Sequence, residues 1–498
     1  MAACFLGEDM KLIFIGNDFK YECEGVMKLF IPAQRFEMVY DDPAQVQGDY
    51  ALVSREDKDG GVRLEARCSY KGKTAAESTE IPKNTAELDD ECEMALCRCL
   101  YKAMSTVTGK CPEWGIITGI RPVKRVNLLL DRGMTEEQIR QEMRTRYLCS
   151  DKKTDIALAT ARTQAEILKT LDKRSFGLYV SIPFCPTRCS YCSFVSQAIE
   201  GCAKMIPEYV RQLCEEIEYT AKISKSIGIY PDSVYFGGGT PTTLSASQLE
   251  AVMGRIEQSF DMSRVREYTV EAGRPDTVTR EKLETIKRMG AGRVSINPQS
   301  INDDVLKAIG RRHTAEQFFE AFDLAQSVGF DVINTDIIAG LPADTQESFE
   351  NTVDTLISKK ADNITVHTLS IKRAARLNHE GTDEVLENPA AEMVAYATDR
   401  LTKSGYIPYY LYRQKNMSDN QENIGWSLKG KESLYNIYIM EEVQTIIAVG
   451  AGGSTKLVDL DNRRLERVFN YKYPNEYLKG FDEMIRRKQE IEDFYAEK

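Results

Sequence analysis

Histidine and long hydrophobic runs are both scarce in this chain of 498 residues, which contains three histidines. The longest apolar runs, such as Leu12 to Ile15 and Thr445 to Val449, are far shorter than the roughly 20 residues that a membrane-spanning helix needs. The first nine residues contain no basic stretch, so we expect no secretory signal peptide. These absences predict a cytoplasmic protein without a membrane span.

An excess of positive charge is also missing. The chain has 65 lysines and arginines against 76 aspartates and glutamates, which gives a net charge of −11. An acidic protein repels phosphate backbones, so we expect no general binding to nucleic acid. The composition, 42% hydrophobic and 28% charged, is ordinary for a globular protein, and the length predicts two or three domains.

Cysteine is present in an odd number, thirteen, and all of it lies before residue 215. With no signal peptide expected, this indicates reduced thiols rather than a disulfide framework. Cys92, Cys97 and Cys99 lie on a stretch that is typical of a helix, and we interpret them as small buried apolar residues. Only one set of cysteines has a spacing typical of metal ligands.

The first part of the chain predicts an α+β domain over residues 1–172. Residues 10–85 alternate short apolar runs with turns, and this pattern indicates a small sheet. Asp57-Lys-Asp-Gly-Gly61 predicts a hairpin turn between two of its strands. Residues 85–170 have apolar side chains three and four positions apart, which is typical of helices.

The middle of the chain, residues 173–385, alternates short β-rich runs with longer helical stretches. Six such repeats predict a parallel sheet with right-handed crossovers. Because six repeats are too few for a closed eight-stranded barrel, we expect an open partial barrel. The predicted strands are Leu178–Ile182, Ser233–Phe236, Tyr268–Glu271, Arg293–Ile296, Val332–Ile338 and Ile364–Leu369.

The last part of the chain, residues 386–498, breaks this repeat and predicts a C-terminal domain that covers the substrate. A helical stretch leads into an aromatic run, Tyr406 to Tyr412, and a later β-rich run ends in Gly450-Ala-Gly-Gly-Ser454.

Three cysteines follow the first predicted strand of the barrel, in a C-x3-C-x2-C pattern. Cys185, Cys189 and Cys192 can supply three thiolates to a [4Fe–4S] cluster, which leaves one iron open. An open iron can bind the amino and carboxylate groups of S-adenosylmethionine (SAM). The alternative is zinc, which normally takes four N or S ligands, and no histidine lies within a hundred residues.

Polar groups stand at the ends of the following strands. Gly237-Gly-Gly-Thr-Pro-Thr242 can expose backbone amides to a ligand, and no Lys-Ser/Thr pair follows it, which excludes a Walker phosphate loop. Charged groups at these positions are costly unless they are paired or contact a ligand. We therefore expect one shared site from the residues at or beyond these strand ends, Glu271, Gln299, Arg311 and Asp336.

These motifs, together with Gly310-Arg-Arg-His313 and the Asp336 to Pro342 segment, resemble the oxygen-independent coproporphyrinogen III oxidase family of radical SAM enzymes, and within it the coproporphyrinogen dehydrogenase (HemZ-type) branch. The resemblance implies a partial (β/α)6 radical SAM barrel with an N-terminal α+β domain and a C-terminal α+β extension. It implies a [4Fe–4S] cluster and SAM as cofactors. It assigns SAM contacts to Tyr179, Tyr191, Gly238, Gly239, Thr240, Glu271, Gln299, Arg311 and Asp336, and catalytic roles to Tyr179, Glu271 and Arg311.

The chemistry that the resemblance implies starts with one electron passed from the reduced cluster to SAM. The resulting radical abstracts hydrogen from a propionate of coproporphyrinogen III, and loss of CO2 and one more electron leaves a vinyl group. The partners implied are this tetrapyrrole and an electron donor such as flavodoxin or ferredoxin, and we expect a monomer. Arginine binds carboxylates bidentately, so we predict Arg274 and Arg373 as propionate contacts.

Two positions differ from the oxidases of that family. Phe194 stands where they have another cysteine, and Ser181 stands where they have a histidine. Haem chaperones also resemble the cysteine loop, including its phenylalanine, and they carry a C-terminal histidine element whose counterpart here is Glu422-Asn-Ile-Gly-Trp426. None of the three histidines, His313, His367 and His379, is a dedicated axial ligand by its sequence context.

The sequence therefore leaves two alternatives to the oxidase. One is a haem-binding, chaperone-like protein. The other is a radical SAM methyltransferase or haem-ring-opening enzyme that acts on another tetrapyrrole.

Overall fold

A computed structural model of the protein describes residues 10–32, 34–42, 48–192, 196–370, 389–414 and 417–496. The chain divides into two compact units, and the division falls between residues 158 and 159. Within the described ranges, no helix is long and apolar enough to cross a membrane.

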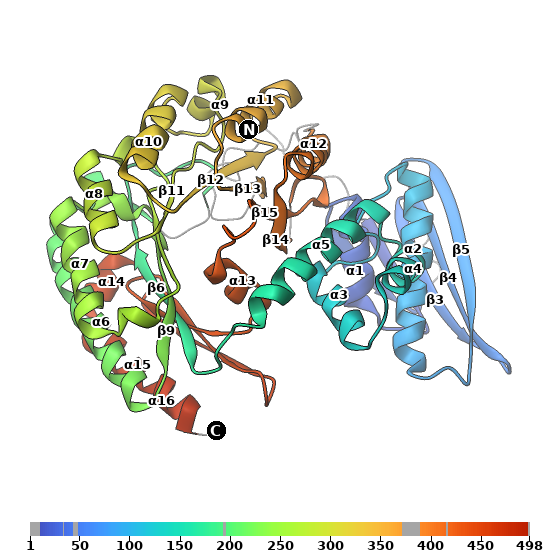
Figure 1. The fold of residues 1–498 in the computed structure, drawn as a ribbon. Coiled ribbons are helices and arrows are strands. Elements are labelled where there is room, and N and C mark those ends of the chain that lie inside the picture. The colour runs from blue at the N-terminus through green and yellow to red at the C-terminus, as the bar shows by residue number, and fades with distance from the viewer. Residues whose placement is uncertain are drawn as a thin grey trace, which may run out of the picture. The chain divides into compact units, whose positions relative to one another are not determined.

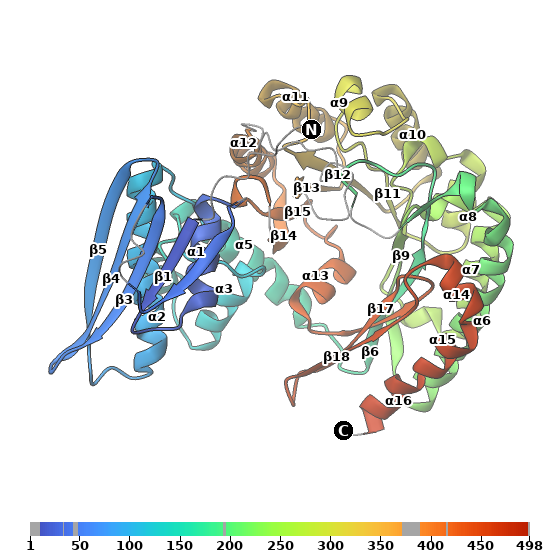
Figure 2. The same ribbon diagram turned by 180° about the vertical axis from the view of Figure 1, so that it is seen from behind.

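The first unit contains a five-stranded sheet with the order β2-β1-β3-β4-β5. Figure 1 labels β3, β4 and β5 of this sheet, and Figure 2 also labels β1. Strand β1 is parallel to both of its neighbours, and β3, β4 and β5 form an antiparallel meander. The bounds are β1 Met10–Ile15, β2 Phe36–Tyr40, β3 Tyr50–Asp57, β4 Gly61–Tyr70 and β5 Lys73–Pro82, with helices α1 Lys20–Phe30, α2 Leu88–Thr108, α3 Pro122–Asp131 and α4 Glu136–Thr145. Helix α5, Asp151–Leu168, begins in this unit and ends in the second.

Local sequence explains most of this unit. The predicted hairpin joins β3 to β4, where the amide of Lys58 donates to the carbonyl of Gly61 at 2.8 Å. The cysteines of α2 are buried, as expected for small apolar residues. Strand β5 was not predicted, because its residues are mostly polar and lack an apolar alternation.

The second unit contains an eleven-stranded sheet whose centre is a run of six parallel strands in chain order, β6 and β9 to β13. The bounds are β6 Ser175–Ile182, β9 Tyr230–Gly238, β10 Glu267–Glu271, β11 Arg293–Ser295, β12 Val332–Ala339 and β13 Asn363–Thr368. The helices between them are α6 Ile206–Ser226, α7 Ala246–Ser259, α8 Arg280–Arg288, α9 Asp303–Ala308, α10 Ala315–Val328 and α11 Gln346–Ser358. These helices lie along the outer side of the curved sheet (Figures 1 and 2). The six predicted strand–helix repeats, and with them the predicted fold class, are confirmed.

The C-terminal residues extend both edges of the same sheet. At one edge β16 pairs in parallel with β6, and a hairpin of β17 and β18 follows; at the other, β15 pairs antiparallel with β13, and β14 pairs with β15. The bounds are β14 Ile407–Tyr412, β15 Asn423–Ser427, β16 Thr445–Val449, β17 Ser454–Asp459 and β18 Arg464–Phe469, with α12 Ala390–Lys403, α13 Leu434–Glu441, α14 Pro474–Lys479, α15 Phe481–Arg487 and α16 Gln489–Ala496. The residues predicted as a C-terminal extension therefore share one sheet with the barrel.

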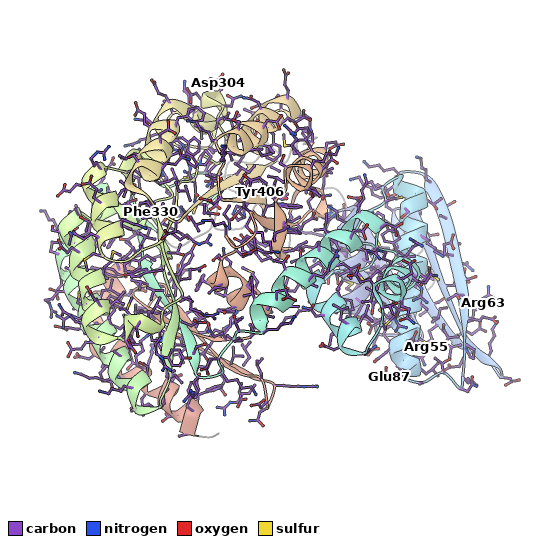
Figure 3. All side chains as sticks on the ribbon, in the orientation of Figure 1. Arg55, Arg63, Glu87, Asp304, Phe330 and Tyr406 are labelled. Atoms are coloured by element: carbon purple, nitrogen blue, oxygen red, sulfur yellow. The ribbon has the colours of Figure 1, made fainter. Side chains whose placement is uncertain are left out.

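Helix α13 differs from the other helices of this unit, because it lies inside the curve of the sheet (Figures 1 and 2). Side chains fill the space that the ribbons leave on this side (Figure 3). We call this concave side the interior face. Tyr179 and Tyr235 lie on it, because their rings stack on Tyr435 of α13, and Glu271 is hydrogen-bonded to Tyr235.

Candidate active site

The three predicted cluster ligands lie on and just after the short strand β7, Phe184–Cys185, which pairs with β8, Gln197–Ala198. Cys185 and Cys189 are buried, and Cys192 is half-buried. The hydroxyl of Thr240 donates to the Cys185 sulfur at 3.5 Å, and Nη1 of Arg274 donates to the Cys189 sulfur at 3.7 Å. Burial raises the pKa of the Cys185 thiol, and the Thr240 hydrogen bond opposes this effect. We call residues 185–192 the cysteine loop.

Among the described residues, no three His, Cys, Asp or Glu side chains form a ready-made metal-binding group. The fit of the cysteine loop to an iron–sulfur cluster therefore depends on donor chemistry and on room. Thiolates are the ligands that such clusters take, and hydrogen bonds to their sulfurs tune the cluster. Room beside Cys185 comes from Gly239, where a Cβ atom would lie 2.5 Å from the carbonyl oxygen of Phe184 and 3.0 Å from the Cys185 sulfur. Both observations fit a cluster.

Arg274 lies beneath the cysteine loop and is 3% exposed. Its Nε and Nη2 atoms donate to the two carboxylate oxygens of Asp276, each at 3.1 Å. Its Nη1 and Nη2 atoms also donate to the carbonyl and hydroxyl oxygens of Thr187, at 3.2 and 3.1 Å. With the Cys189 contact, its guanidinium is enclosed by the protein, whereas a propionate contact requires an accessible guanidinium. The second predicted propionate contact, Arg373, lies outside the described residues.

Glu271 ends β10 on the interior face and has a partner that the sequence did not indicate. The hydroxyl of Tyr235, on β9, donates to Oε1 of Glu271 at 2.6 Å. Burial raises the pKa of Glu271 to about 7; the Tyr235 hydrogen bond opposes this effect, and the charge of Asp336 adds to it. Tyr179, on β6, is in register with Tyr235, and the two rings stack. Glu271 is therefore a carboxyl group that can change its charge near neutral pH.

Asp336 lies on β12 and accepts two side-chain hydrogen bonds, from Nδ2 of Asn297 at 2.8 Å and from Nδ2 of Asn334 at 3.0 Å. Gln299 is fixed next to this strand in a left-handed backbone conformation, with φ 67°. Its amide donates to the carbonyl of Asp336 at 3.0 Å, and its carbonyl accepts from Ile338 at 3.1 Å. Within the described residues, its buried Oε1 atom has no hydrogen-bond donor. A buried amide oxygen of this kind suits a ligand that donates.

Arg311 connects the cysteine loop to the strand ends. Its Nη1 atom donates to the carbonyls of Gly273 and Asn297, both at 3.0 Å, and Nη2 donates to the hydroxyl of Tyr191 at 3.2 Å. Burial, and after it the positive charge of Arg311, lower the pKa of the adjacent His313 to about 3, so His313 is neutral at physiological pH. The hydrogen bond between Arg311 and Tyr191 therefore joins the cysteine loop to the strand ends.

The segment 237–242, which we call the glycine segment, begins with the last two residues of β9 and lies against the start of the cysteine loop. Gly238 has φ 107°, a conformation that side chains rarely adopt, and the amide of Gly239 donates to the carbonyl of Ile182 at 2.8 Å. Ser181, at the position where the family's oxidases have histidine, donates from its hydroxyl to the carbonyl of Ala451 at 2.7 Å. Ser181 therefore binds the C-terminal glycine segment.

The predicted residues fall into groups joined by contacts that the structure records. Thr240 contacts Cys185, the missing side chain of Gly239 leaves room beside Cys185, Tyr191 contacts Arg311, and the charge of Asp336 raises the pKa of Glu271. Sequence reasoning missed Tyr235 and the stacking of Tyr435. The available signal was the alternation along β9, which places Tyr235 on the same face as Gly237, two residues later.

Comparison with known proteins agrees with this geometry. Residues 179–356 match the radical SAM superfamily. The chain is 39% identical over 398 residues to the oxygen-independent coproporphyrinogen-III oxidase-like protein HemZ of Bacillus subtilis, covering 77% of this chain and 78% of that protein. It is 29% identical over 320 residues to the heme chaperone HemW of Lactococcus lactis, covering 63% and 79%.

A solved structure of coproporphyrinogen III oxidase (HemN) from Escherichia coli superposes with a TM-score of 0.50 at 22% identity, over 65% of this chain and 73% of that chain. At this identity the superposition shows a common fold.

Proposed function

This chain belongs to the radical SAM superfamily, in the family of the oxygen-independent coproporphyrinogen-III oxidase-like proteins, and from that premise we propose that it converts propionates of coproporphyrinogen III to vinyl groups without oxygen. Proteins of this superfamily use a [4Fe–4S] cluster and SAM. One observation carries the proposal. The 398 residues of similarity to the Bacillus subtilis relative extend well beyond residues 179–356, so they include regions outside the shared superfamily core.

In this proposal Cys185, Cys189 and Cys192 hold the cluster. When bound, the cluster and SAM supply a one-electron cleavage that produces a carbon radical able to abstract hydrogen. The chain keeps the cysteine loop in place through the contacts of Thr240 and Arg274 with two of the sulfurs. Radical SAM chemistry requires an electron donor, and we propose flavodoxin or ferredoxin, acting on a monomer in the cytoplasm.

The SAM site in this proposal is the interior face below the cysteine loop. Glu271 and Asp336 provide negative charge for the cationic ammonium and sulfonium groups of SAM. The Oε1 atom of Gln299, which has no donor in the described part of the chain, accepts a hydrogen bond from SAM. Arg311 and Tyr191 orient the loop relative to the strands, and burial of these groups strengthens their electrostatic interactions. We propose catalytic roles for Tyr179, Glu271 and Arg311 and SAM contacts for Tyr179, Tyr191, Gly238, Gly239, Thr240, Glu271, Gln299, Arg311 and Asp336.

For the substrate, we propose Arg373 as a propionate contact. Arg274 takes a different role from the one expected, because its donors already serve Asp276, Thr187 and Cys189. We assign it to the support of the cysteine loop.

A heme chaperone is the second candidate function, because the heme chaperone HemW of Lactococcus lactis matches 63% of this chain. The structure offers little to support it. Glu422, the counterpart of the chaperones' histidine, is 0% exposed, and the residues of β15 that follow it are all buried. The side chain of His313 is also buried, and His367 lies 3.9 Å from the carboxylate of Asp336.

The test is an anaerobic reaction of the reconstituted protein with SAM, a reductant and coproporphyrinogen III, followed by mass spectrometry. The proposal predicts two successive losses of the mass of formic acid, which is CO2 plus two hydrogens. An unchanged porphyrinogen alongside 5′-deoxyadenosine would contradict it and favour action on another tetrapyrrole, such as methyl transfer or ring opening. Stoichiometric haem binding without turnover would favour the chaperone.

A further inference from the structure

Tyr235 lies between the carboxyl group of Glu271 and the ring of Tyr435, on the interior face. Its hydroxyl makes the 2.6 Å hydrogen bond to Glu271. Its ring stacks on that of Tyr435, with centroids 4.3 Å apart and planes 21° apart. Tyr179 closes the group, at 6.2 Å from Tyr235 and 6.0 Å from Tyr435. We call Tyr179, Tyr235 and Tyr435 the tyrosine stack.

Helix α13, which carries Tyr435, is fastened to the barrel at its first turn. The carboxylate of Glu267, on β10, accepts hydrogen bonds from the Ser433 hydroxyl at 3.0 Å and from the amides of Leu434 at 2.8 Å and Tyr435 at 3.1 Å. A carboxylate at this end of a helix satisfies unpaired amides and opposes the positive end of the helix dipole. Tyr435 is therefore held in place by Glu267 as well as by stacking.

A buried arginine supports the same connection. Nη2 of Arg293, on β11, donates to the carbonyls of Lys431 and Glu432, both at 2.7 Å, and Nε lies 3.5 Å from the Glu267 carboxylate. Both Arg293 and Glu267 have side chains that are 7% exposed. Separation of α13 from the sheet would leave this pair with unmet hydrogen bonds in a buried place, which is costly.

From these contacts we propose that Tyr235 is a positioning residue of the SAM site, which orients the Glu271 carboxylate through its hydroxyl while Tyr435 fixes its ring. This inference rests on the proposed function, because Glu271 is a SAM contact only in that proposal. The inference adds Tyr235 as a residue that acts through Glu271. It also explains the position of α13, because Tyr435 of this helix supports the ring of Tyr235.

The electrostatics around Glu271 indicate what the Tyr235 hydroxyl does. The groups that face the carboxyl are the phenols of Tyr179, Tyr235 and Tyr435 and the carboxylate of Asp336. Burial and Asp336 both disfavour its charged form, and the Tyr235 hydrogen bond favours it. Loss of the hydroxyl therefore raises the pKa of Glu271, so a larger fraction of the carboxyl groups is protonated at neutral pH.

The test compares Tyr235→Phe with Tyr435→Phe. Both changes remove one phenol oxygen from the tyrosine stack, but no side-chain hydrogen bond is recorded for the Tyr435 hydroxyl in the part of the chain that the structure describes. SAM affinity is measured by equilibrium dialysis from pH 6 to 9, and SAM cleavage is measured without any tetrapyrrole. Cluster absorbance and thermal unfolding check that each variant is folded and loaded.

Tyr235→Phe should weaken SAM binding about tenfold at pH 7, the size expected for a hydrogen bond to a charged group. The pH at which binding is half-maximal should move upward, and the rate of cleavage at saturating SAM should change little. Tyr435→Phe should match the wild type in all three. Wild-type affinity and an unmoved pH profile in Tyr235→Phe would overturn the inference, as would equal effects of the two changes.

Because these measurements use no tetrapyrrole, a wrong substrate in the proposed function would leave their outcome intact. Failure of the wild type to bind SAM would overturn both proposals.

Discussion

At the scale of single residues, two charged side chains near the strand ends differ in how the protein accommodates them: Arg274 is buried, and Glu271 is half-buried. Arg274 has a partner for its guanidinium on the cysteine loop and another in Asp276. Among the residues that the structure describes, Glu271 has one hydrogen-bond donor, Tyr235, and it is close enough to Asp336 to be affected by its charge. The hydrogen-bond donors of Arg274 thus find acceptors within the protein. The charged form of Glu271, in contrast, is disfavoured by desolvation and by Asp336, and a cationic ligand can offset this free-energy cost.

The cost of burying Glu271 predicts a pH-dependent stability. Its pKa is raised to about 7 in the folded protein, so the folded state binds a proton more tightly than the unfolded state. Folding stability should therefore be lost as the pH rises from the ordinary glutamate pKa through 7, by about 3 kcal/mol at roughly 1.4 kcal/mol per pKa unit.

Glu271→Gln removes this dependence, so the variant should be more stable than the wild type at pH 8 and equally stable near pH 4.5. Denaturant unfolding of the cluster-free protein across this range measures the difference. Glu284→Gln, an exposed carboxylate on α8, is the control and should follow the wild type. A Glu271→Gln advantage that does not change with pH would contradict the shifted pKa.

Arg274 gives a second prediction at this scale. Lysine keeps the charge but replaces the planar fork with a single ammonium group, which cannot reach Asp276, Thr187 and Cys189 in the same way. Arg274→Lys should destabilise the protein by about 1–3 kcal/mol, the cost of unmet buried hydrogen bonds, and should lower the iron content after reconstitution. Arg280→Lys, on an exposed arginine, should do neither. Full iron content in Arg274→Lys would show that the loop does not need this support.

At the scale of elements, local pattern and long-range pairing differ in how far they can be predicted. The six parallel strands were predictable, because buried β-rich runs alternate with helical stretches, and parallel strand ends meet at one edge. The cysteine loop, the glycine segment and Arg311 follow from spacing and from the resemblance. Helix α13 was not predicted, because Leu434–Glu441 is apolar on all sides and lacks the one-sided pattern of a surface helix.

The hydrogen bond between Tyr235 and Glu271 could not be predicted from the sequence either. It joins residues 36 positions apart on neighbouring strands, and their contact depends on strand register rather than on local sequence. Arg274 was predicted as a substrate contact, and its hydrogen bonds to Asp276, two residues later, and to Thr187 of the cysteine loop were not apparent from the sequence.

The attachment of α13 gives a prediction at the element scale. Glu267→Gln offers the first turn of the helix an amide N–H group in place of one of its two acceptor oxygens. The change should destabilise the second unit by about 1–3 kcal/mol. It should also weaken SAM binding through Tyr435 and Tyr235, measured on the same samples. Unchanged SAM affinity in a clearly destabilised Glu267→Gln would mean that α13 supports the fold and not the site.

At the scale of the whole molecule, the C-terminal residues are locked into the second unit by a buried ion pair. Nζ of Lys488 lies 2.9 Å from the carboxylate of Glu216, on α6, and their side chains are 1% and 0% exposed. Tyr477 and Asn470 also donate to this carboxylate, each at 2.7 Å. The amide of Gly450 donates to it at 2.7 Å, next to the segment that binds Ser181. The end of the chain is thereby tied to the strand that precedes the cysteine loop.

Breaking the ion pair between Lys488 and Glu216 should lower the free energy of unfolding strongly. Lys488→Met leaves an uncompensated buried carboxylate and should cost about 3–5 kcal/mol of unfolding free energy. The double change Glu216→Gln with Lys488→Met removes both charges and should recover part of that loss. Thermal or denaturant unfolding of the three proteins measures it. A single variant as stable as the wild type would show that the pair is not needed to hold the C-terminal residues.

We propose that this chain uses a SAM-derived radical to remove hydrogen from a propionate of coproporphyrinogen III. The most direct test supplies the substrate with deuterium on the propionate carbon next to the ring and measures the mass of the 5′-deoxyadenosine produced. If the radical abstracts this hydrogen, the 5′-deoxyadenosine is heavier by one mass unit and vinyl products form. Unlabelled 5′-deoxyadenosine beside an intact porphyrinogen would contradict it.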